Sequence, residues 1–281
     1  HTDMEYLRKH WSGKKASAPT LEKKHDKYFL RFTYAEEVAL NRTPVKEQTI
    51  CSVDLGINTD AVCTIMRPDG TILGRKFINF PSDKDRMYRV LGRIRRFQRE
   101  HGSRQVQGRW AYAKRLNTEL GKKIAREIVF YASENRADVI VFEYLEMKGK
   151  LSGKKKQKLQ MWRKRDIQKR CGQQAHRKGI RISRICAWNT SRLAFDGSGK
   201  IDRDIQDHRL CTFQNGKRYN CDLSASYNIG ARYFIREILK PLPATERSLL
   251  EAKVPAVKRR TSCVYADLRD LISEMELRKA A

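Results

Sequence analysis

The sequence has no long apolar run and few acidic residues. No stretch approaches the roughly 18 to 20 apolar residues of a membrane-spanning helix, and no apolar segment near the N-terminus resembles a signal peptide. Only 32 Asp and Glu stand against 60 Lys and Arg, which gives a formal net charge of +28. A field of that sign and size favours polyanions, so we expect a nucleic acid as partner and no membrane.

Cysteines are also few, and their number is odd. Several of the seven lie in strand-like apolar runs, which is typical of reduced thiols in the cytoplasm and argues against a disulfide framework. A chain of 281 residues, 40% of them hydrophobic, is long enough for one substantial core with appendages.

One strand-like stretch places a carboxylate in an apolar setting. Val53 and Leu55 flank Asp54, so this carboxylate would cost several kcal/mol to bury unless a cation or hydrogen bonds satisfied it. Further strands are expected over 61–66 and 72–77, after turns. Three consecutive antiparallel strands with an acid on the first begin an RNase H-like nuclease fold. Taken alone, an Asp-Leu-Gly triplet in a strand is more often structural than catalytic.

Two further acids lie in suitable places. Glu143 ends a β-branched strand, and Asp222 stands at the head of a predicted helix. Three carboxylates can hold two divalent metal ions, of which one activates the attacking water and the other stabilises the leaving oxygen. Hard oxygen ligands select Mg²⁺ or Mn²⁺ over zinc. The alternative is three unrelated acids at the ends of strands and helices.

The segments around these acids resemble the three RuvC motifs of TnpB-type transposon nucleases and of the type V CRISPR effectors descended from TnpB. They are Asp54–Asn58, Val139–Leu145 and Asp222–Ile229. Residues 188–191 resemble the start of the zinc-finger-like insertion of that family, and the whole resemblance runs from about residue 50 to 239.

The resemblance implies an α/β fold, with an RNase H-like (RuvC) mixed sheet flanked by helices. It implies an RNA-guided DNA endonuclease of the prokaryotic cytosol or nucleoid, with guide RNA and target DNA as partners. Asp54, Glu143 and Asp222 would be its catalytic metal ligands, for two Mg²⁺ or Mn²⁺ ions.

The expected organisation has five parts. Residues 1–48 would end a β-rich wedge-like domain, with 1–26 as a loosely held lead-in before a strand over 27–36. The remaining parts are 49–188, the first part of the nuclease with a basic helix over 157–178; 189–220, a lid or degenerate zinc-finger-like insertion that binds the target strand; 221–245, the last part of the nuclease; and 246–281, a basic and helical tail. The recognition lobe of the family has no counterpart here, and the chain does not begin with Met. A missing N-terminal half or a second chain would then carry that lobe, although an artificially shortened chain would look the same.

Basic residues gather on two predicted helices and in the insertion. The first helix, over 83–100, has an arginine-rich face, and between 146 and 178 thirteen Lys or Arg stand against two acids. We expect nucleic-acid contacts there, whereas the alternative is a solvated charged face. The candidate contacts are Arg93, Arg96, Arg163, Lys164, Arg165, Lys169, Arg170, Arg203 and Arg218.

The insertion departs from the family pattern. The resemblance implies two Cys-x-x-Cys pairs with the spacing of a tetrahedral zinc site, but of the four positions only Cys211 is a cysteine. We therefore expect no zinc and a metal-free lid with hairpin turns at 197–199 and 215–216. An improvised site from His208, Cys211 and Cys221 is the alternative.

Two other functions remain open. One is a nuclease-silent, RNA-guided DNA-binding module, against which the complete acidic triad argues. The other is a general basic RNA-binding scaffold, which would carry heterogeneous RNA in place of one defined species.

Overall fold

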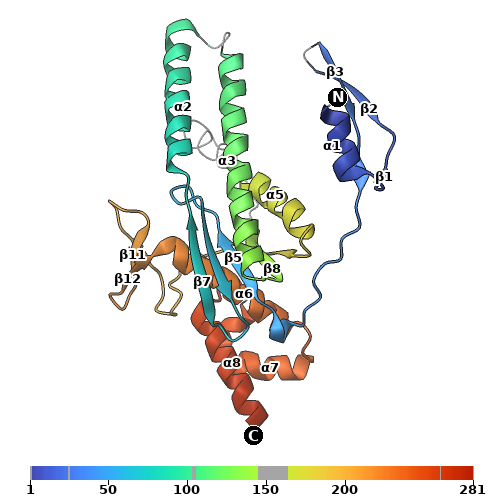
Figure 1. Ribbon diagram of the computed structural model, residues 1–281. Coiled ribbons are helices and arrows are strands. Elements are labelled where there is room, and N and C mark those ends of the chain that lie inside the picture. The colour runs from blue at the N-terminus through green and yellow to red at the C-terminus, as the bar shows by residue number, and fades with distance from the viewer. Residues whose placement is uncertain (1, 25, 103–105, 145–163, 260, 281) are drawn as a thin grey trace. The chain divides into compact units, whose positions relative to one another are not determined.

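The computed structural model describes residues 2–24, 26–102, 106–144, 164–259 and 261–280 (Figure 1). The chain forms two compact units, residues 1–39 and 40–281. In the described residues, no helix has the length and apolar character needed to cross a membrane.

The N-terminal unit contains more regular structure than its sequence predicts. Its elements are α1 (Thr2–Trp11), β1 (Lys15–Ala16), β2 (Thr20–Lys24), β3 (Lys27–Arg31) and β4 (Tyr34–Ala35). β2 and β3 form an antiparallel hairpin and β1 pairs with β4. Trp11 stacks on Tyr34, with ring centroids 5.1 Å apart. The loosely held lead-in was therefore a wrong prediction, because an aromatic contact with β4 holds the end of α1.

The second unit is built on a five-stranded sheet in the order β7-β6-β5-β8-β9. The strands are β5 (Ile50–Asp54), β6 (Ala61–Met66), β7 (Ile72–Ile78), β8 (Val139–Tyr144) and β9 (Arg181–Cys186). β5, β6 and β7 are antiparallel neighbours, whereas β8 runs parallel to β5 and β9 parallel to β8. The three predicted consecutive antiparallel strands are thus confirmed.

Helices cover both faces of this sheet. α3 (Gln107–Glu134) and α5 (Lys164–His176) pack on the face that receives Cys51 and Val53. α6 (Cys221–Leu239) and α8 (Tyr265–Ala280) pack on the face that receives Ile50. Since side chains alternate along a strand, Asp54 belongs to the α6 face.

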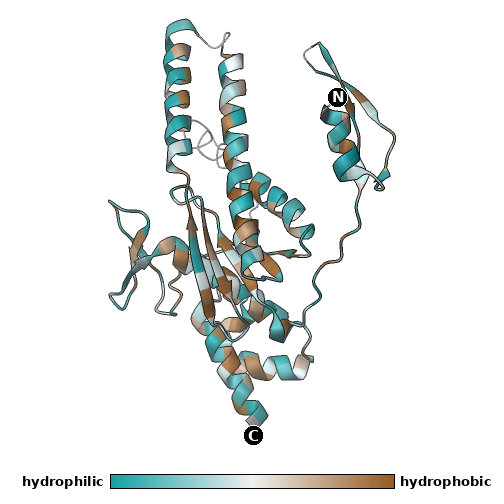
Figure 2. Ribbon diagram, viewed as in Figure 1, coloured by the Kyte–Doolittle hydropathy of each residue, from teal (hydrophilic) through white to brown (hydrophobic). Residues whose placement is uncertain are grey.

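The remaining elements extend from this core. α2 (Pro81–His101) pairs with α3 as an antiparallel hairpin (Figure 1), and hydrophilic residues predominate along it (Figure 2). β10 (Asp202–Arg203), β11 (Leu210–Thr212) and β12 (Arg218–Asn220) form a small antiparallel sheet in the insertion. The short helix η1 (Val45–Glu47) precedes β5, and α7 (Ala244–Lys253) and η2 (Pro255–Lys258) lead to α8.

α6 is buried on nearly all sides, and not only along the single stripe that its periodicity predicts. Its Arg232 is 3% exposed and joins three parts of the chain. The Nε atom donates to the Cys263 carbonyl at 2.8 Å, and Nη1 donates to the carbonyls of Cys186 at 2.9 Å and Trp188 at 2.7 Å. One guanidinium thus fastens the end of β9 and the segment directly before α8 to the same helix.

Replacing Arg232 by Met should lower the free energy of unfolding by about 2–4 kcal/mol, because buried carbonyls would lose their donor while the cost of burying a charge is relieved. Urea denaturation of wild type and variant measures this difference. Arg269→Met, at an exposed position of α8, is the control and should change stability by less than about 0.5 kcal/mol. Equal stability of the Arg232 variant and the wild type would show that the three hydrogen bonds of Arg232 do not stabilise the fold.

Candidate functional site

Asp54 is the last residue of β5 and Glu143 the last but one of β8, and the two lie at the same level in neighbouring strands. Val53 lies opposite Phe142 in the parallel pair of β5 and β8, so the next residue of each strand is Asp54 and Glu143. Neighbouring strands lie about 4.8 Å apart, and both side chains belong to the α6 face. Asp222 comes from the first turn of α6. All three acids line one cleft of about 400 Å³.

Local geometry brings Asp222 to the cleft. Asn220 caps α6, since its side chain accepts a hydrogen bond from the Leu223 amide at 2.9 Å. At Gly56, the loop after β5 lies close to Thr59 and Asp222. A Cβ atom there would lie 2.4 Å from the Thr59 carbonyl oxygen and 3.6 Å from Asp222 Oδ2. Only glycine leaves room there. The side chain of Thr59 also hydrogen-bonds Asp222.

Glu143 is held by two residues that the sequence did not single out. The Thr190 hydroxyl donates to Glu143 Oε1, and Gln168 Nε2 donates to the Glu143 carbonyl oxygen at 2.9 Å. Thr190 Oγ1 also lies 3.1 Å from the Ala187 carbonyl. Its single proton serves one acceptor at a time, and the charged carboxylate is the stronger one. Lys164 Nζ lies 3.9 Å from Glu143 Oε2.

The cleft carries negative charge that its own cations do not fully offset. Burial raises the pKa of Asp54 well above its usual value, and repulsion from Glu143 raises it further, against the pull of Lys164. Burial also raises the pKa of Asp222, while the hydrogen bond from Thr59 opposes the rise. The pKa of Lys164 is lowered by burial, against the attraction of all three acids.

The donor set suits a divalent cation in chemistry and charge. Carboxylate oxygens are the ligands that Mg²⁺ and Mn²⁺ prefer. The pKa values of Asp54 and Asp222 are raised, so a bound cation would stabilise the ionised form of both carboxylates. Within the described parts of the chain, however, no three His, Cys, Asp or Glu side chains meet as a ready metal cage. An ion shared by the triad would require these side chains to draw closer.

The structure brings only some of the predicted basic residues to the cleft. Lys164 and Arg203 line it. Arg93 and Arg96 are exposed on α2, Arg165 and Lys169 on α5, and Arg218 on β12. Arg170 pairs with Asp166 at 2.9 Å, and Arg218 lies 3.3 Å from Asp204. Arg163 falls outside the described residues, as does the part of the predicted basic helix before Lys164.

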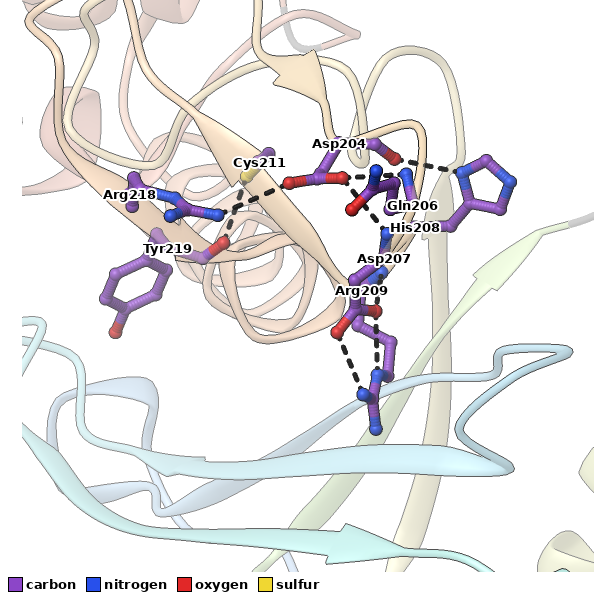
Figure 3. A network of polar contacts seen from close by, with 8 residues as sticks. All are labelled: Asp204, Gln206, Asp207, His208, Arg209, Cys211, Arg218 and Tyr219. Atoms are coloured by element: carbon purple, nitrogen blue, oxygen red, sulfur yellow. Dashed lines mark hydrogen bonds and ion pairs between the residues drawn. The ribbon is translucent and has the colours of Figure 1, made fainter.

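The insertion is held by aromatic packing and polar turns. Phe195 packs against Phe213 and Tyr219, with ring centroids 5.6 and 4.9 Å away. Cys211 is buried beneath them. Figure 3 shows Asp204 joined to Arg218 and to the backbone of its own turn, and the His208 ring points away from Cys211. The absence of zinc stays a prediction.

No signal in the sequence separates Thr190 and Gln168 from other polar residues, because neither belongs to an acidic or basic pattern. Lys164 was found as one basic residue among many. Its place beside the triad follows from the packing of α5 on α3.

Comparison with known proteins supports the fold. No protein-family model and no curated protein matches the sequence. The Cas12f1–sgRNA–target DNA complex matches with a TM-score of 0.52 and 18% identity, over 74% of this chain and 54% of that one. The fold is similar to that of a type V CRISPR effector. This finding confirms the resemblance drawn from the three motifs.

Two further solved structures match less closely. The CRISPR-Cas12f ternary complex has a TM-score of 0.47 and 16% identity, over 81% of this chain and 48% of that one. The Cas12i–crRNA–dsDNA complex has a TM-score of 0.47 and 11% identity, over 98% and 44%. The chain thus spans about half the length of the Cas12f1 protein that it matches.

Thr190→Val should weaken Mn²⁺ binding by about 10- to 100-fold, because Glu143 loses the donor that orients its carboxylate. Isothermal titration without nucleic acid measures this affinity. Thr190→Ser keeps the hydroxyl and should restore most of it, which a purely structural role of the γ-methyl would not predict. Identical affinity of wild type and the valine variant would remove Thr190 from the site.

Proposed function

We propose that this chain is the catalytic part of an RNA-guided DNA endonuclease with an RNase H-like (RuvC) fold. The observation that carries the proposal is the meeting of Asp54, Glu143 and Asp222 in one cleft, at the ends of β5, β8 and the start of α6. The sheet order, with three antiparallel strands followed by two parallel ones, supports the RNase H-like assignment.

The partners and the location follow from the same proposal. The Cas12f1 structure holds a single-guide RNA and target DNA, so we propose guide RNA and target DNA as the partners of this chain, in the prokaryotic cytosol. A net charge of +28 suits both.

The residues of the cleft would have different roles in phosphodiester hydrolysis. When bound, Mg²⁺ or Mn²⁺ would activate a water molecule and stabilise the leaving oxygen. Asp54, Glu143 and Asp222 provide the oxygen ligands, and Thr190 keeps the Glu143 carboxylate oriented. Arg203, at the exposed side of the cleft, attracts the phosphate and offers hydrogen bonds to it.

A second candidate is a nuclease-silent, RNA-guided DNA-binding module. It is favoured by the absence of a ready metal cage among the described residues and by Lys164, which already places a positive charge beside Glu143. The two candidates differ in one property, which is cleavage of bound DNA in the presence of a divalent metal.

Asp54→Asn, Glu143→Gln and Asp222→Asn should each lower Mg²⁺-dependent cleavage of DNA by at least about 100-fold, since each removes a charged ligand and keeps the volume. Binding to the same DNA in EDTA should change little. Asp85→Asn, at an exposed position of α2, is the control. Full activity of one triad variant would exclude that residue, and a wild type that binds but never cleaves would establish the silent module.

The exposed basic residues of α5 should contribute to phosphate binding. The double variant Arg165→Ala/Lys169→Ala should reduce the slope of log K against log salt concentration by about 1.8, at about 0.9 for each lost contact with duplex DNA. Both residues are exposed on α5, so the fold should tolerate the change. A salt titration in EDTA measures the slope.

The matched control is Arg269→Ala/Lys279→Ala, which removes the same charge from exposed positions on α8. Its slope should stay close to that of the wild type. If the two double variants behaved alike, the basic face of α5 would be a solvated surface and not a binding face.

A further inference from the structure

Trp188 is an aromatic side chain left open to solvent near the cleft. It lies on the segment between β9 and Thr190, and it is 67% exposed. Tryptophan normally buries much of its large apolar surface, and here two thirds of that surface is available for contact.

The backbone that carries Trp188 is firmly held. Arg232 Nη1 donates to the carbonyls of Cys186 and Trp188, at 2.9 and 2.7 Å. Two residues later, the Thr190 carbonyl accepts a hydrogen bond from Asn228 Nδ2 at 3.0 Å. Arg232 and Asn228 are buried residues of α6. The exposure of the indole is therefore a property of an ordered segment.

This segment runs along the edge of the cleft. Glu143 lies opposite Ile185 in the pair of β8 and β9, and Trp188 is the third residue after Ile185. The Cα atoms of Ile185 and Trp188 are then at most about 11 Å apart. On the other side, Ser191 lines the cleft. Trp188 thus lies on the chain between Ile185, which pairs with Glu143, and Ser191, which lines the cleft.

Two exposed arginines flank Trp188 in the sequence, four residues before it and four residues after it. Arg184 on β9 and Arg192 after Thr190 are both exposed, and the chain as a whole carries +28. Exposed aromatic rings with neighbouring arginines are typical of surfaces that bind single-stranded nucleic acid, where bases stack on the rings and phosphates meet the cations. A base inside a duplex has both faces covered by its neighbours and offers no face to the indole.

We infer that Trp188 is a stacking platform for an unpaired nucleobase of the strand that passes the cleft. This inference rests on the proposed function for the class of partner, and it adds a contact that the triad does not supply. The stacked base would fix the strand beside the cleft without selecting its sequence, because every base has an aromatic face.

Trp188→Ala should weaken binding of a single-stranded DNA oligonucleotide by about 5- to 140-fold, which corresponds to about 1–3 kcal/mol. Binding is measured by fluorescence anisotropy in EDTA, so that no cleavage occurs. Trp188→Phe keeps an aromatic face and should recover most of the loss. Affinity for the matched duplex should stay unchanged in both variants.

Leu277→Ala is the control, since Leu277 is also an apolar residue with 67% exposure but lies on α8. It should bind both oligonucleotides as the wild type does. A set of single strands with one abasic site at successive positions adds a second readout. An abasic site at one of these positions should weaken binding to the wild type. The same abasic site should cause no further loss of binding to Trp188→Ala.

Three results would overturn the platform. These are unchanged single-strand affinity of Trp188→Ala, an equal loss for single strand and duplex, and a loss of binding to another protein with nucleic-acid binding intact. The proposed nuclease is judged separately, by Mg²⁺-dependent cleavage with the wild type. If Trp188→Ala lost single-strand affinity while the wild type never cleaved DNA, the stacking role would be supported and the nuclease rejected.

Discussion

The cost of gathering three carboxylates in a mostly buried cleft is the constraint on which this structure depends. Burial and mutual repulsion raise the pKa of Asp54, and burial raises that of Asp222. Three interactions offset this cost. Lys164 lies beside Glu143, the Thr190 hydroxyl donates to the same carboxylate, and the Thr59 side chain hydrogen-bonds Asp222. The first turn of α6 also favours a negative charge, because amide groups there point out of the helix.

α6 connects this cleft to the rest of the second unit. Asp222 stands at its start, while Asn228 and Arg232 hold the segment that bears Thr190 and Trp188. Arg232 also reaches the Cys263 carbonyl, so the tail that ends in α8 is fastened to the same helix. A change in the packing of α6 would therefore alter the positions of Asp222 and Thr190 together.

The insertion shows how a segment of this kind can fold around apolar side chains. Structural zinc sites supply folding free energy through their ligands. Here the small sheet of β10, β11 and β12 gathers Phe195, Phe213 and Tyr219 around the buried Cys211. Aromatic packing is a source of stability that needs no metal, and the absence of zinc stays a prediction.

Much of the architecture was determined by the sequence, because local patterns specify local structure. The run around Asp54 predicted three antiparallel strands, and the positions of Glu143 and Asp222 at the ends of a strand and a helix were predicted from the residues beside them. The structure has all of these. The sequence was misleading over 1–26, where α1 is held by a contact between Trp11 and Tyr34. Only the tertiary structure decided that Thr190, Gln168 and Lys164 surround Glu143, and that Trp188 stays exposed on a segment fastened by Arg232. These contacts join residues of different elements, and no local periodicity records them, since the partners meet only when helices pack on the finished sheet.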